Sequence, residues 1–74
     1  MPQLPVLSGE EIIKILETIG YEKVRRQSSH IRLSHPERKS ITVPDYKTVS
    51  RGLLRKILRD AELTPEEFIE IIEN

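Results

Sequence analysis

The chain has 74 residues and no cysteine. We therefore expect one small domain over residues 1–74, with neither a disulfide framework nor a thiolate metal site to supplement its core. The apolar runs are only two or three residues long, which excludes a membrane-spanning helix. No charged start followed by an apolar stretch is present, so no secretory signal is expected and a cytoplasmic protein is the default.

The formal net charge of zero conceals a segregated charge distribution. Residues 1–22 carry a net charge of −3, residues 23–59 carry eleven Lys and Arg against two acids, a balance of +9, and residues 60–74 carry −6. A basic block of this kind is typical of a domain that binds a polyanion, and a solvated, salt-bridged surface is the alternative. The concentration of positive charge in one half of the chain favours binding.

The first helix is expected over Glu10–Ile19. Ser8 is a good N-cap, and Glu11 three residues later completes a capping box. Gly20 follows the last apolar residue and ends the helix. The segment before it, Met1–Val6, contains two prolines and little periodicity, so we expect a loose lead-in. The apolar stripe of this helix consists of Ile12, Ile13, Ile15, Leu16 and Ile19.

Three short strands are expected next, over residues 22–27, 30–34 and 40–43. Tyr21 and Val24 are the main apolar positions of the segment Tyr21–Gln27, which contains the first strand, and the Lys and Arg residues of this segment are typical of an edge strand. Ser28 and Ser29 form the turn into the second strand. Residues 35–39, which include a proline, form the loop before the third.

Two further helices complete the chain. We expect the second over residues 51–61, with an apolar stripe on one side and basic residues on the other. Thr64, Pro65 and Glu67 provide the N-cap, the first helical residue and the capping box of a short acidic helix. The order is therefore α-β-β-β-α with a short C-terminal helix appended. Two amphipathic helices on one face of a three-stranded antiparallel sheet make a two-layer α+β sandwich.

His30 is the candidate for chemistry. Alternation at period two places Ile31 and Leu33 inward and His30 and Arg32 outward, so the histidine would stand exposed at the turn among cations. Histidine side chains, with a reference pKa of about 6.5, exchange protons near neutrality, and arginines stabilise a phosphorane. His30 flanked by Arg26 and Arg32 has the parts for metal-free proton transfer from a ribose 2′-OH. An ordinary surface histidine is the alternative.

Other kinds of site have weaker support in the sequence. His30 and His35 have no compact spacing with Glu37 or Asp45, so neither a metal site nor a cofactor is expected. We interpret His35 as a polar residue of the hairpin loop. Tyr46 either packs at the foot of the second helix or stacks on a base. The cations expected to contact RNA phosphates are Arg25, Arg26, Arg32, Lys47, Arg51, Arg55 and Arg59.

A set of short motifs runs through nearly the whole chain. They are Leu7-Ser8-Gly9, Gly20-Tyr21, Ser29-His30, Ile41-Thr42-Val43-Pro44, Gly52-Leu53-Leu54-Arg55-Lys56-Ile57-Leu58 and Phe68. In this order and spacing the chain resembles the HicA (YcfA-like) toxins of type II toxin–antitoxin systems. The Gly-Ser-His motif of that family stands here as Ser28-Ser29-His30, and many members carry a histidine where this chain has Tyr46.

The resemblance implies a double-stranded-RNA-binding-like fold, cleavage of mRNA, and neutralisation by a HicB-type antitoxin. It also gives His30 the role of the catalytic histidine, with Ser28 and Ser29 forming the turn that supports it. Our leading interpretation is a metal-independent endoribonuclease toxin. One alternative is a non-catalytic RNA-binding module on the same fold, which Ser28 and Tyr46 leave open. A second is a protein-interaction domain for an acidic partner, which salt-sensitive RNA binding would exclude.

Overall fold

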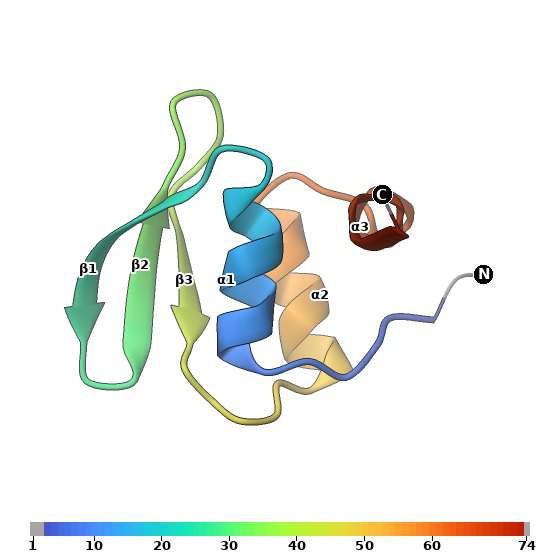
Figure 1. Ribbon diagram of the computed structural model, residues 1–74, viewed down its shortest axis with the longest axis horizontal. Coiled ribbons are helices and arrows are strands. Elements are labelled where there is room, and N and C mark those ends of the chain that lie inside the picture. The colour runs from blue at the N-terminus through green and yellow to red at the C-terminus, as the bar shows by residue number, and fades with distance from the viewer. Residues whose placement is uncertain (1–2, 74) are drawn as a thin grey trace.

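The computed structural model describes residues 3–73. In chain order it contains α1 (Gly9–Glu17), β1 (Glu22–Gln27), β2 (His30–Ser34), β3 (Ile41–Pro44), α2 (Arg51–Asp60) and α3 (Pro65–Glu73). The strands form one antiparallel sheet in the order β1-β2-β3. Helices α1 and α2 lie beside the sheet, and α3 lies on the side of these helices away from it (Figure 1). The predicted α+β class and α-β-β-β-α order are confirmed.

The helices begin where the capping chemistry predicts. Ser8 Oγ accepts a hydrogen bond from the Glu11 amide at 3.1 Å, and the Glu11 carboxylate accepts one from the Ser8 amide at 2.9 Å. Thr64 and Glu67 form the same reciprocal pair before α3. There, the hydrogen bond from the Thr64 backbone amide lowers the pKa of the Glu67 carboxyl from its usual value. None of the helices within residues 3–73 is long and apolar enough to cross a membrane.

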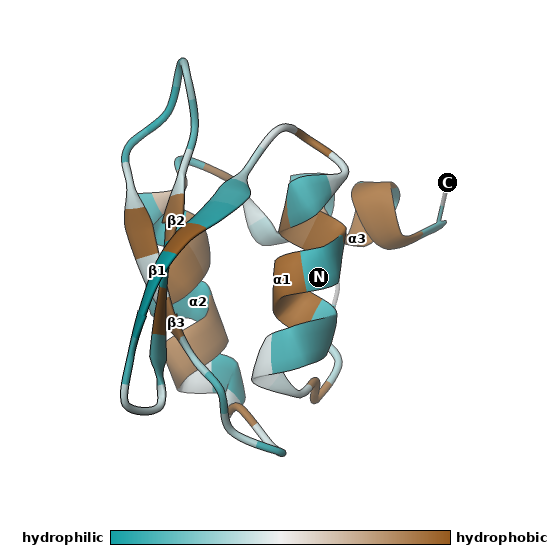
Figure 2. Ribbon diagram, turned by 60° about the vertical axis from the view of Figure 1, so that its left-hand side comes forward, coloured by the Kyte–Doolittle hydropathy of each residue, from teal (hydrophilic) through white to brown (hydrophobic). Residues whose placement is uncertain are grey.

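The core lies between the helices and one face of the sheet. Ile31 pairs with Val43 and Leu33 pairs with Ile41 across β2 and β3, and all four side chains are buried. Both α1 and α2 carry hydrophobic bands, whereas β1 is mostly hydrophilic (Figure 2). The inward and outward parity predicted for β2 is confirmed, and its outward residues are left on a face that the helices do not cover.

The segment before α1 differs from the prediction. Met1–Val6 was expected to be a loose lead-in, and its first two residues lie outside the described part of the chain. Leu4, however, is fully buried, with 0% of its surface exposed. Its carbonyl also accepts a hydrogen bond from Arg51 Nε at 2.6 Å. Burying a leucine contributes about 1.5–3 kcal/mol, which offsets the entropy of ordering a short segment already restricted by prolines.

Helix α1 ends at Glu17, two residues before its predicted end at Ile19, and the chain then forms a tight turn up to Gly20. Gly20 has a φ of +109°, and the Tyr21 amide donates to the Leu16 carbonyl at 3.3 Å. This is the glycine-terminated helix end that the sequence predicts. A Cβ at Gly20 would lie 2.9 Å from His35 Nε2, so the loop between β2 and β3 also requires glycine here.

The loop between β2 and β3 is hydrogen-bonded to the chain just after α1 and just after α2. His35 Nδ1 accepts a hydrogen bond from the Glu37 amide at 2.9 Å, so its Nε2 carries the proton that is donated to the Ile19 carbonyl at 2.8 Å. Arg38 Nη1 donates to the Ala61 carbonyl, at the end of α2, at 3.0 Å. His35 is therefore a structural residue of the loop, in line with its interpretation from the sequence.

Candidate functional site

The turn between β1 and β2 holds its two serines in different conformations. Gln27 pairs directly with His30, and Ser28 has a φ of +58° whereas the φ of Ser29 is not positive. This φ pattern is that of a type II′ turn, whose first central position normally takes glycine. Ser28 thus keeps the turn geometry at a cost in backbone strain. The Asp45 amide donates to the Ser29 carbonyl at 2.6 Å and fixes the turn to the chain after β3.

Ser28→Gly is expected to raise the free energy of unfolding by about 1 kcal/mol, because glycine adopts a positive φ without the clash of a Cβ. For a domain of this size the melting temperature should rise by about 4–8 °C. Ser29→Gly is the matched control. It should lower stability, since it adds unfolded-state entropy and relieves no strain. Urea and thermal denaturation of both variants measure the difference, and equal effects would show that Ser28 is unstrained.

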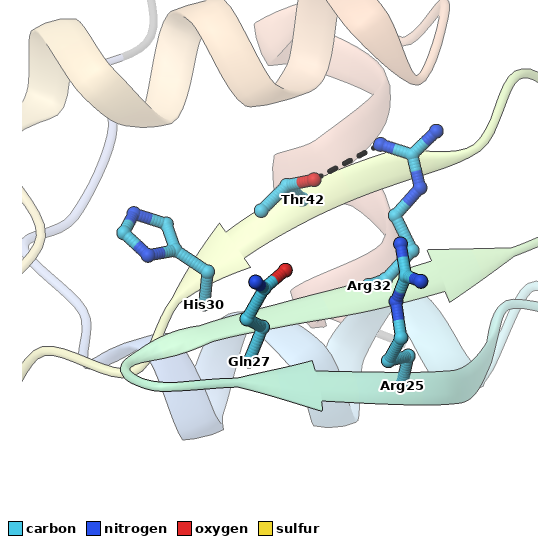
Figure 3. A pocket seen from close by; sticks show the side chains of 5 residues that line it. All are labelled: Arg25, Gln27, His30, Arg32 and Thr42. Atoms are coloured by element: carbon cyan, nitrogen blue, oxygen red, sulfur yellow. Dashed lines mark hydrogen bonds between the residues drawn. The ribbon is translucent and has the colours of Figure 1, made fainter.

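The sheet face away from the helices carries a hollow of about 180 Å³, lined by Arg25, Gln27, His30, Arg32 and Thr42. The imidazole of His30 lies at one end, the two guanidinium groups lie at the other, and the Gln27 amide lies between them (Figure 3). Arg32 Nη1 donates to Thr42 Oγ1 at 3.0 Å, which orients that guanidinium group. No lining residue is acidic, so the hollow is positively charged and suits a phosphate.

Arg26 was expected to flank His30 and instead lies on the other face of β1. It pairs with Ile31, and its Nη2 lies 2.8 Å from Asp45 Oδ2 in an ion pair. The reason is parity. Because the two-residue turn places Gln27 opposite His30, every second residue back along β1 shares that face, and Arg25 takes the position assigned to Arg26.

Val24 is also placed differently from the expectation that it would be a main apolar position of β1. The register of β1 against β2 shifts between Lys23 and Arg25, leaving Val24 in a bulge with 57% of its surface exposed. All six residues of β1 are exposed, as suits the charged edge strand that was predicted.

The cations of the second half of the chain lie outside the hollow. Lys47, Arg51, Arg55 and Arg59 are exposed, and none of them lines it. Arg51 is engaged with the Leu4 carbonyl. These residues remain predicted RNA contacts on a separate part of the surface.

Tyr46 lies in the segment that follows β3. Its side chain is 45% exposed, so its ring is not buried at the foot of α2. Its carbonyl accepts a hydrogen bond from the Gly9 amide at 2.8 Å. A Cβ on Gly9 would overlap the Pro44 carbonyl oxygen, so glycine allows α1 to begin directly against the end of β3.

Gln27 and Thr42 were not assigned to the site from the sequence. From the sequence, Gln27 is the residue before the turn and Thr42 is a residue of the third strand and of the Ile41-Thr42-Val43-Pro44 motif, with no role in the site assigned to either. The signal that identifies both is parity, since Gln27 pairs with His30 and Thr42 pairs with Arg32. Once the turn and the strand register are known, all outward positions near His30 follow from them.

A family model described as HicA toxin of bacterial toxin–antitoxin matches residues 9–63. The chain belongs to the HicA toxin family. The HicA match runs from α1 through α2 and contains every residue of the hollow, whereas α3 lies beyond it. Membership in the HicA family makes the protein a toxin of a toxin–antitoxin system and implies an antitoxin partner. No curated protein matched the chain.

Proposed function

We propose that this toxin is a metal-independent endoribonuclease that cleaves mRNA in the cytoplasm through His30 and is neutralised by a HicB-type antitoxin. The observation that carries the proposal is the position of His30. The His30 side chain lines the same solvent-exposed hollow as the guanidinium groups of Arg25 and Arg32. Within residues 3–73, no hydrogen bond or ion pair occupies its ring, in contrast to His35.

The proposed reaction is a transesterification of the RNA backbone. His30 takes the proton of a ribose 2′-OH, and the 2′ oxygen forms a bond to the adjacent phosphorus while the bond from phosphorus to the 5′ oxygen breaks. The protonated ring returns this proton to the departing 5′ oxygen. The products are a 2′,3′-cyclic phosphate and a 5′-hydroxyl. Arg25 and Arg32 stabilise the additional negative charge on the phosphorane, where charge-assisted hydrogen bonds are strongest.

The test is cleavage of a single-stranded RNA by the pure wild-type protein in EDTA, with the product ends identified by mass spectrometry. Cleavage that leaves a 2′,3′-cyclic phosphate is the expected result. Loss of activity in EDTA would contradict the metal-free mechanism. Salt-sensitive binding without cleavage would instead identify a non-catalytic RNA-binding module.

Arg55→Ala and Arg59→Ala are each expected to weaken binding of all single-stranded RNAs alike. Their side chains are exposed on α2 and lie outside the hollow, so they would bind phosphates rather than bases. For each phosphate that a variant no longer binds, the salt dependence of the binding constant should become shallower by about one unit of slope. Lys14→Ala is the control, because that lysine is paired with Glu10 on α1. Weaker binding of one RNA sequence alone would make these arginines base readers.

A further inference from the structure

Gln27 occupies a position in the hollow that neither proton transfer nor charge stabilisation explains. It is the last residue of β1 and the direct partner of His30 across the turn, so its Cβ lies about 4.5–5.5 Å from that of the histidine. Its side chain is exposed and therefore contributes nothing to the core. Figure 3 shows its amide between the imidazole and the two guanidinium groups, where a nucleotide bound in the hollow would meet it.

The chemistry of an amide differs from that of every other group in the hollow. Arg25 and Arg32 present only donors, which suit phosphate oxygens, and the Thr42 hydroxyl already accepts from Arg32. The Gln27 amide presents a donor and an acceptor side by side and carries no charge. Such a pair matches the N6 donor and N7 acceptor of adenine. Guanine presents two acceptors, O6 and N7, at the same edge.

We propose that Gln27 selects the base at the cleavage site by accepting a hydrogen bond from adenine N6 and donating one to adenine N7. The base belongs to one of the two nucleotides that flank the scissile phosphate, since Gln27 lies directly across the turn from His30. This role rests on the proposed function, because it assigns a specificity-determining residue to that same site. Gln27 reads the base, His30 moves the proton, and the two arginines bind the phosphate.

The experiment compares short single-stranded RNAs that differ only in having adenine or guanine beside the scissile phosphate. We expect the wild-type protein to have a kcat/KM about tenfold higher for adenine, the discrimination expected of one bidentate contact to a base. Gln27→Ala should remove this preference by lowering the adenine value about tenfold more than the guanine value, because guanine N7 can accept only one hydrogen bond from the amide. Replacing the adenine by 7-deazaadenine, which lacks N7, should slow the wild-type protein and leave Gln27→Ala unaffected.

Thr42→Val is the matched control within the hollow. It removes the hydroxyl that orients Arg32 and should lower kcat/KM for both RNAs by the same factor. If Gln27→Ala also lowers both values equally, the amide acts on the phosphate and the proposed selection is wrong. If Gln27→Ala changes neither value, Gln27 is a bystander, and the proposal is wrong for that reason.

Dissociation constants for the same RNAs separate the failure of this inference from that of the proposed function. A wild-type protein that prefers adenine in binding and cleaves neither RNA would contradict the endoribonuclease and retain the base reader. A protein that cleaves both RNAs at equal rates and binds them equally would retain the endoribonuclease and overturn the role of Gln27.

Discussion

His30→Ala is expected to lower the rate of RNA cleavage by roughly 10²–10⁴, the usual cost of losing a positioned acid–base group. Toxicity on expression should disappear with it. The fold should persist, because His30 is exposed at a turn and its ring has no hydrogen-bond partner within residues 3–73, and surface changes usually stay within about 0.5 kcal/mol. Cleavage assays, growth of cells that express the variant and melting curves of the purified protein measure these three properties.

His35→Ala provides the converse control. It removes the acceptor of the Glu37 amide and the donor to the Ile19 carbonyl, together with a ring that packs 4.9 Å from that of Tyr21. Unfolding should become easier by about 1–3 kcal/mol, while cleavage by the folded fraction should persist. If His30→Ala cleaved as fast as the wild-type protein, His30 would be an ordinary surface histidine.

Leu4→Ala is expected to lower the free energy of unfolding by about 2–4 kcal/mol, since it leaves a cavity where a fully buried leucine packs. In a domain this small, such a decrease is a large fraction of the total stability. Val6→Ala is the matched control, because that valine lies in the same segment and is 51% exposed. It should change stability by no more than about 0.5 kcal/mol. Equal effects in urea denaturation would restore the interpretation of this segment as a loose lead-in.

The features that could be predicted from the sequence depend on local chemistry. The capping pairs Ser8–Glu11 and Thr64–Glu67 are complete within four residues each, so they predict where α1 and α3 begin. The alternation around Ile31 likewise predicts the buried face of β2. The exposure of His30 follows from the same alternation and requires no knowledge of the tertiary structure.

The features that were missed depend on how distant segments meet. Leu4 is a single apolar residue among prolines, and only the packing of the folded core shows that it is buried. The bulge at Val24 is a property of the β1–β2 register, which the sequence of one strand does not specify. The assignment of Arg26, instead of Arg25, to the face of His30 has a different cause, because the sequence alone contains the information that corrects it. The sequence predicts the turn, and counting back from it by twos finds Arg25 and Gln27.

The position of α3 gives the molecule an electrical property that its net charge hides. The acidic residues that end the chain lie on α3 and the turn before it, whereas the cationic hollow lies on the sheet, with α1 and α2 between them (Figure 1). The protein is therefore a dipole. Near a polyanion such as RNA, the protein experiences a torque that turns its sheet toward the polyanion and α3 away from it before any contact forms. Its association rate should consequently fall with ionic strength as that of a basic protein does, although its formal net charge is zero.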